Sequence, residues 1–158
     1  MVSMTYEKLA KEIVEAVVNA SPNLKGAVTG HGPTNRIGGA SGFRHQIDVS
    51  IEILNEKLLL VECKRYQSKV TVSDMLILIA RINDIRKKRS EQVTGCFFTT
   101  KGYTGPAKKV GTFYDIELNT FTGVKPFAVH IAGNTFIKPE AMDLNVSVSG
   151  SYAKNRDV

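Results

Sequence analysis

The residues of this sequence that are best placed to do chemistry are two carboxylates and an amine. Glu62 and Lys64 directly follow the apolar run 58–61, and Asp48 lies in the alternating segment that precedes it. Side chains alternate along a strand, so Glu62 and Lys64 project from one face and Cys63 from the other. If the two segments pair as a hairpin, we expect Asp48 to face Glu62 with Lys64 beside them.

Such a group of side chains has a defined chemical use. Two carboxylates and a main-chain carbonyl make an oxygen-only site of the kind that Mg²⁺ prefers. A bound Mg²⁺ polarises a phosphodiester and lowers the pKa of a water molecule, and a lysine stabilises charge on the phosphate. The alternative is that Glu62 and Lys64 form an exposed pair at a strand end, which contributes less than about 1 kcal/mol.

Hydrophobic periodicity predicts the elements that must position these residues. Residues 4–20 are expected to form an amphipathic helix, because their apolar side chains recur at three- and four-residue spacing. Residues 45–54 and 57–66 are expected to be the two strands of a β-hairpin. The glycine-rich segment 29–44 has no apolar period and is expected to be a loop.

The second half of the chain alternates between predicted helices and strands. Residues 72–89 and 105–114 have helical patterns, and residues 92–100 and 115–121 have strand patterns. The resulting order, αββαβαβ, predicts an α/β fold in which at least one helix crosses between neighbouring strands.

Length, charge and cysteine usage limit the class of protein. The 158 residues are expected to form one domain, with a core over 1–125 and an extension of strand-like runs and a polar tail over 126–158. The net charge of +6 favours a polyanionic partner, although it also suits a surface that is basic for solubility. Two cysteines without a CxxC pair, and no apolar run of membrane-spanning length, predict a cytoplasmic protein.

The motif residues resemble the D…(D/E)xK signature of the PD-(D/E)XK nuclease superfamily. The sequences IDV at 47–49 and VECK at 61–64 are similar to those of Mrr-like restriction endonucleases and, more distantly, of archaeal-type Holliday junction resolvases. The similarity extends over residues 5–122 and includes YEKLAKEIVEA and GCFFTTKGYTGPAKKVG. It implies a restriction-endonuclease-like αβββαβ core, in which helices flank a central mixed sheet.

The resemblance also implies a role for each matching residue. Asp48 and Glu62 match the metal-binding carboxylates, and Lys64 matches the catalytic lysine. The carbonyl of Cys63 matches the main-chain metal ligand, and Glu7 matches a glutamate of the first helix that supports the metal site. Mrr-type enzymes often carry Gln at the position of Glu62, so this chain has the acidic form that is commoner in the superfamily.

The activity that the resemblance implies is Mg²⁺-dependent DNA endonuclease activity, with Mn²⁺ as a substitute for Mg²⁺. A single site cuts one strand, so duplex cleavage calls for a homodimer or for sequential nicking. The alternative is a non-catalytic nucleic-acid-binding module on the same fold. Residues that flank the motif or carry positive charge are predicted to contact nucleic acid: Tyr66, Gln67, Arg86, Lys87, Lys88 and Lys101.

Two features of the segment before Asp48 have competing interpretations. His45 suggests a general base, but a histidine at a strand edge is more often a hydrogen-bonded surface group, and this superfamily needs no histidine. The glycine-rich residues 38–42 are not followed by the lysine of a phosphate-binding loop. We interpret them as a mobile lid that gives DNA access to Asp48.

Overall fold

The centre of the molecule is a mixed β-sheet. The computed structural model describes residues 28–53, 57–64, 68–121, 127–131, 134–138 and 146–148. Within these residues the sheet has six strands in the order β1–β4–β5–β6–β7–β10. The strands are β1 (Val28–His31), β4 (Val49–Ile53), β5 (Lys57–Lys64), β6 (Gln92–Thr99), β7 (Glu117–Phe121) and β10 (Val146–Val148).

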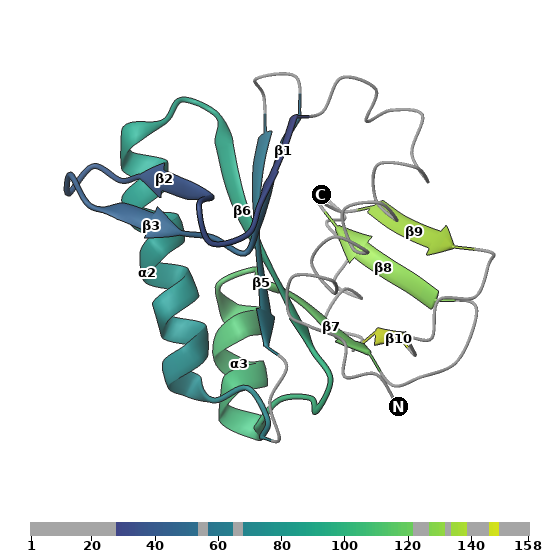
Figure 1. The fold of residues 1–158 in the computed structure, drawn as a ribbon. Helices are drawn as coiled ribbons and strands as arrows, with labels where there is room; N and C mark the ends of the chain where they lie inside the picture. Colours follow the sequence, from purple (N-terminus) through teal and green to yellow (C-terminus); the bar gives the residue numbers. More distant parts are fainter. Residues whose placement is uncertain are drawn as a thin grey trace, which may run out of the picture.

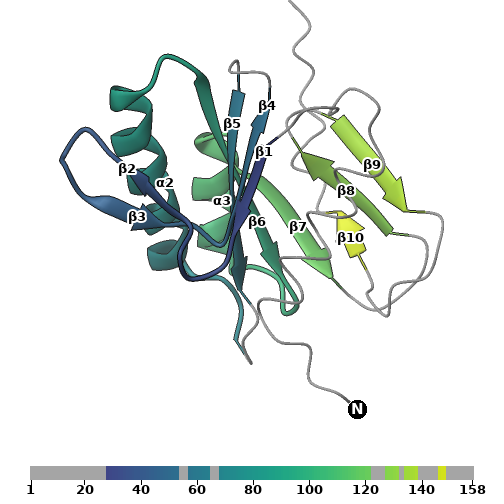
Figure 2. The same ribbon diagram turned by 45° about the horizontal axis from the view of Figure 1, so that its top comes forward.

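Helices cover one face of this sheet. Figure 1 shows α2 (Val72–Lys88) and α3 (Gly105–Phe113) on this face, together with the hairpin of β2 (Arg36–Gly38) and β3 (Arg44–Gln46). The pair β8 (Phe127–Ile131) and β9 (Asn134–Lys138) lies on the opposite side of the sheet in both Figure 1 and Figure 2. The expected α/β core, a central mixed sheet flanked by helices, is therefore confirmed.

The connections between strands explain the mixed sheet. β4 and β5 form an antiparallel hairpin in which Val49 pairs with Val61 and Glu52 with Leu58. α2 then crosses from β5 to a parallel β6, and α3 crosses from β6 to a parallel β7. Parallel neighbours need such a crossover, because a tight turn can only join antiparallel strands.

The core lies between α2 and the sheet. Alternation along β5 directs Leu58 and Leu60 toward α2, where they join a buried cluster with Leu78 and Ile82. Gly95 of β6 lets α2 approach closely, since a Cβ there would lie 2.3 Å from Ile82 Cδ1. The same alternation directs Glu62 and Lys64, the next two even-numbered residues of β5, toward α2.

The segment 29–44, which the sequence predicts to be a loop, instead contains regular structure. β1 pairs antiparallel with β4, with Gly30 opposite Ser50, and β2 pairs with β3. The strand predicted over 45–54 is also interrupted, because the chain bends between β3 and β4. The Ile47 N–H donates a hydrogen bond to the Asn35 carbonyl at 3.0 Å and fixes this bend.

Two further predictions meet the limits of the described residues. The helix predicted over 4–20 and the polar tail that ends the chain lie outside them. β10, which lies beyond residue 125, pairs with β7 of the central sheet. The predicted division of the domain at residue 125 stays a prediction. None of the helices in the described part of the chain is long and apolar enough to cross a lipid bilayer.

Candidate active site at the end of β5

The structure brings Asp48 and Glu62 together on the α2 side of the sheet. The β4–β5 register, carried one residue beyond the Val49–Val61 pair, places Asp48 opposite Glu62. The Cys63 N–H donates to Asp48 Oδ2 at 2.9 Å, and a side-chain hydrogen bond joins the two carboxyl groups. The Gly32 N–H, directly after β1, donates to the Asp48 carbonyl at 3.2 Å and holds the backbone at Asp48 from that side as well.

The environment of Glu62 disfavours its charge. Burial, the neighbouring negative charge of Asp48 and the hydrogen bond with Asp48 raise the pKa of Glu62 from 4.5 to about 8. Arg81 of α2 acts in the opposite direction, with its Nη1 2.5 Å from Glu62 Oε1, but does not offset burial and Asp48. At high pH, when both carboxyl groups are ionised, Arg81 does not fully compensate their negative charge.

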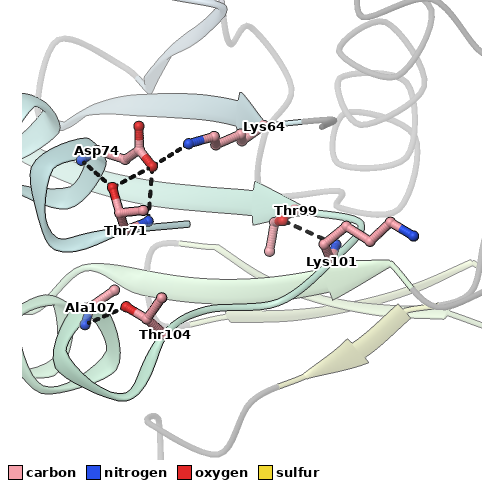
Figure 3. A network of polar contacts seen from close by, with 7 residues as sticks. All are labelled: Lys64, Thr71, Asp74, Thr99, Lys101, Thr104 and Ala107. Atoms are coloured by element: carbon pink, nitrogen blue, oxygen red, sulfur yellow. Dashed lines mark hydrogen bonds and ion pairs between the residues drawn. The ribbon is translucent and has the colours of Figure 1, made fainter. Parts of the chain in front are cut away.

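Lys64 projects from the same face as Glu62 and reaches the first turn of α2. Its ammonium group forms an ion pair with Asp74, as Figure 3 shows. Asp74 Oδ2 also accepts hydrogen bonds from the Thr71 N–H at 2.8 Å and from Thr71 Oγ1 at 2.9 Å, which closes the N-cap of α2. Burial tends to raise the pKa of Asp74, but the hydrogen bonds from Lys64 and Thr71 lower it below its ordinary value.

A pocket of about 220 Å³ opens between β5 and α2 beside these groups. Since a water molecule takes up roughly 30 Å³ of liquid, the pocket has room for a phosphate group together with water. Two ion pairs line it, Glu62 with Arg81 and Lys64 with Asp74, and Asp48 adjoins the pocket through its contact with Glu62. Its lining residues are Glu62, Lys64, Asp74, Ile77, Leu78, Arg81 and Phe97.

The donors at this site fit a hard divalent cation. Asp48 and Glu62 offer carboxylate oxygens, and the Cys63 carbonyl belongs to the residue between Glu62 and Lys64. No group of three or more His, Cys, Asp or Glu side chains that would hold a metal ion occurs among the described residues. Mg²⁺ does not need such a cage, because it keeps several waters and commonly binds proteins through one or two carboxylates. A cation there would also counteract the burial and the repulsion by Asp48 that together raise the pKa of Glu62.

Of the other predicted site residues, those that the structure describes do not line the pocket. Glu7, Tyr66 and Gln67 are outside the described residues. Arg86 Nη2 donates to the Val93 carbonyl at 2.8 Å and so links α2 to β6. Three further lysines with predicted nucleic-acid contacts are exposed: Lys87, Lys88 and Lys101.

Asp74 and Arg81 line the pocket, and the motif did not point to them. They are seven residues apart on α2, which is two helical turns, so they share the face of the helix that carries Leu78. This seven-residue spacing is visible in the sequence. Because α2 follows β5 and packs back on it, the spacing could have indicated that both residues lie opposite Glu62 and Lys64. His45 lies outside the pocket, because its Nε2 contacts Asp84 Oδ2 at 2.7 Å.

Solved structures share the fold of this chain. The crystal structure of AF1548, a protein of unknown function, is 19% identical with a TM-score of 0.57, over 72% of this chain and 57% of that one. The structure of an EndoMS–dsDNA complex is 13% identical with a TM-score of 0.50, over 75% of this chain and 45% of that one. This chain thus spans about half the length of either protein.

Sequence comparison identifies the family. No curated protein gives a significant match to the chain. The Mrr_cat family model, described as restriction endonuclease, matches residues 23–123 and so covers well over half of the sequence. The match includes β1 to β7 with α2 and α3, and therefore every strand and helix that lines the pocket. The chain accordingly belongs to the Mrr_cat restriction endonuclease family, a family of nucleases.

Proposed function

We propose that this protein is a Mg²⁺-dependent DNA endonuclease whose active site is the pocket between β5 and α2. The contact between the partly buried carboxyl groups of Asp48 and Glu62 is the observation that carries the proposal. Two neighbouring carboxyl groups in a buried position are costly unless a cation or a proton neutralises them. A nuclease that uses a divalent cation has a reason to keep such a pair.

Each residue of the site has a distinct task in this proposal. Asp48 and Glu62, with the Cys63 carbonyl, hold the metal ion, and the Cys63 N–H fixes the orientation of Asp48. The bound ion supplies Lewis-acid activation of the phosphodiester and of the attacking water. Lys64 donates to a non-bridging oxygen of the phosphate, where negative charge increases in the transition state. Mn²⁺ has a similar preference for oxygen ligands and substitutes for Mg²⁺.

DNA is the proposed substrate. The net charge of +6 favours a polyanion, and the EndoMS structure that shares this fold is a complex with double-stranded DNA. One such site cuts one strand, so cleavage of both strands calls for a homodimer or for two successive nicks.

A plasmid-nicking assay tests the proposal. Supercoiled plasmid incubated with the protein and Mg²⁺ or Mn²⁺ is expected to give nicked circles, and incubation with EDTA is expected to leave it intact. Cleavage that continues in EDTA would remove the metal from the proposal. DNA binding without cleavage under any of these conditions would favour the non-catalytic module.

The contact between Lys64 and Asp74 gives a further prediction. Asp74→Asn keeps an oxygen for the Thr71 N–H but removes the negative charge that holds Lys64, so nicking is expected to fall by about tenfold. Thr71→Ala removes the N-cap hydroxyl and leaves that charge in place, so it is expected to destabilise the fold by about 1 kcal/mol with little change in nicking.

Asp74 has two roles, to hold Lys64 and to complete the N-cap of α2. Thermal unfolding and nicking rates, measured on both variants, separate these roles. Asp74→Glu is the conservative variant, and it is expected to recover part of the activity. Equal losses of activity in Asp74→Asn and Thr71→Ala would mean that Asp74 acts only through the helix cap.

A further inference from the structure

The turn of the β2–β3 hairpin is hydrogen-bonded to Asp84 of α2 through both the carboxylate and the main-chain carbonyl of that residue. Asp84 accepts hydrogen bonds from the Ser41 N–H at 2.8 Å, from the Ser41 hydroxyl at 2.6 Å and from His45 Nε2 at 2.7 Å. The carbonyl of Asp84 accepts a fourth bond from the Ala40 N–H at 3.0 Å. The hydrogen bonds from Ser41 and His45 lower the pKa of Asp84 to about 2, so the carboxylate stays charged at neutral pH.

The backbone of the turn is fitted to this anchor. A Cβ on Gly39 would lie 1.9 Å from Asp84 Oδ2, and Gly42 has a positive φ of 87°. The Gly39 N–H donates to the Phe43 carbonyl at 2.9 Å, which closes the loop between β2 and β3. These contacts hold residues 38–42 against α2, so the interpretation of this segment as a mobile lid finds no support.

The anchored turn presents an aromatic ring to solvent. The side chain of Phe43 is 63% exposed, and its ring packs edge-on against His45 with the centroids 5.0 Å apart. His45 is itself bonded to Asp84, so the ring has a defined direction. A single exposed Phe is common on protein surfaces and does not by itself indicate a binding site, so the neighbouring residues must be considered.

That setting is cationic. Arg36 and Arg44 are exposed on paired strands, and Arg44 Nη2 donates to the Arg36 carbonyl at 3.3 Å. Lys88 Nζ, from the last turn of α2, lies 3.0 Å from the position that a Cβ on Gly38 would take. The acidic group of this region, Asp84, is occupied by its bonds to the hairpin. The hairpin thus carries an exposed aromatic ring and two exposed arginines, with Lys88 next to it, a combination that suits nucleic acid.

The hairpin is also close to the proposed site of cleavage. Phe43 and Asp48 are five residues apart, so their Cα atoms are separated by at most about 18 Å. On the helix, Asp84 lies three residues beyond Arg81, a rise of about 4.5 Å. Since B-DNA rises about 3.4 Å per base pair, a duplex that is cut at Asp48 and Glu62 and runs toward the hairpin would reach it within about five base pairs.

We propose that the β2–β3 hairpin is a preformed contact surface for duplex DNA, in which Phe43 packs into a groove while Arg36 and Arg44 bind phosphates. The position of the cut phosphate in this proposal rests on the proposed function. The contact itself needs no metal ion and no catalysis, so it is measured as binding.

Fluorescence anisotropy with a labelled 30-base-pair duplex in EDTA tests the contact without cleavage. Phe43→Ala is expected to weaken binding by about 5- to 20-fold with an unchanged salt dependence, because the ring contributes no charge. Arg44→Ala is expected to reduce the slope of log K against log salt by about one. Phe113→Ala is the matched control: this Phe of α3 is 79% exposed and is expected to leave binding unchanged.

Asp84→Ala tests whether Asp84 positions the hairpin for DNA binding. A role in charge alone and a role in positioning predict opposite changes in DNA affinity. Removing a negative charge from a DNA-binding surface strengthens binding if only charge counts. If Asp84 positions the hairpin, the same change is expected to weaken binding about as much as Phe43→Ala. Thermal unfolding shows whether Asp84→Ala is folded. Ser41→Ala, which removes the hydroxyl that bonds Asp84, repeats the test with less disturbance.

The outcomes distinguish this inference from the proposed function. Wild-type affinity in both Phe43→Ala and Arg44→Ala overturns the contact surface, whether or not the protein cuts DNA. Weakened binding in these variants supports the contact surface even if no nicking is found. If the variants change self-association in analytical ultracentrifugation but not DNA affinity, the hairpin joins two copies of the chain, and the proposal is wrong.

Discussion

Lys64→Ala is expected to lower the rate of plasmid nicking by about 100- to 1000-fold, the range found when a single preorganised donor to a developing negative charge is removed. Asp48→Ala is expected to lose at least as much, because Asp48 is a proposed metal ligand. Neither change is expected to unfold the protein. Asp74 retains its bonds from Thr71 when Lys64 is removed, and an ion pair near the surface contributes only about 0–1 kcal/mol.

Lys101→Ala is the comparison for Lys64→Ala. Lys101 is a predicted nucleic-acid contact, so its removal is expected to weaken binding of the plasmid and to leave the cleavage step unchanged at saturating plasmid. Lys101 follows β6 and is exposed, and its contact with Thr99 Oγ1 uses its backbone N–H, which the substitution keeps. Figure 3 shows Lys64 at the end of β5 and Lys101 in the loop that follows β6. Nicking rates measured at saturating Mg²⁺ and plasmid on purified proteins make the comparison. Lys64→Ala within threefold of the wild type, or Lys101→Ala with an equal loss, would contradict the role given to Lys64.

The metal-free protein is expected to lose stability as the pH rises through the range in which Glu62 titrates. The pKa of Glu62 is raised in the folded state, so folding favours the protonated carboxyl group. That stability is fully present below the ordinary pKa of 4.5 and is lost as the pH rises to about 8. A shift of this size corresponds to a fall in the free energy of unfolding on the order of 3–5 kcal/mol.

Glu62→Gln isolates this contribution from those of other groups. The amide does not titrate, so the variant is expected to match the wild type near pH 4.5 and to be the more stable protein above pH 8. Urea unfolding from pH 4.5 to 8.5 in EDTA measures both curves. Parallel curves for the two proteins would show that Glu62 ionises normally and that the Asp48–Glu62 pair is not strained.

The same two proteins report on the metal without any activity measurement. Mg²⁺ at about 100 times its Kd stabilises a folded protein by about 2.7 kcal/mol. Above pH 8 we expect this gain for the wild type and a much smaller one for Glu62→Gln. Equal responses would place the bound ion away from Glu62.

Much of the fold could be predicted because its signals are local. The alternation of Ile47 to Ile53 and the apolar run before Glu62 predict the β4–β5 hairpin, and the apolar stripe of 72–89 predicts α2. These patterns arise from burial against one surface, which is visible in the sequence as a period. Because register follows from that alternation, the meeting of Asp48 with Glu62 could be expected as well.

The rest depends on contacts between distant segments. β2 and β3 have three residues each, too few for a period, and their place is set by Asp84, which is about 40 residues away in the chain. The ion pairs of Lys64 with Asp74 and of Glu62 with Arg81 likewise depend on how α2 lies on β5. A motif defines which groups do the chemistry, but not which neighbours hold them.

β5 has hydrogen-bonded neighbours along both edges, an antiparallel one in β4 and a parallel one in β6. Its backbone amides can open to solvent only when one of these ladders comes apart, which in a sheet of this kind means the cooperative loss of the whole core. Glu62 and Lys64 therefore belong to a strand that is expected to open only together with the core. On heating, catalytic competence and the folded state should disappear in a single step.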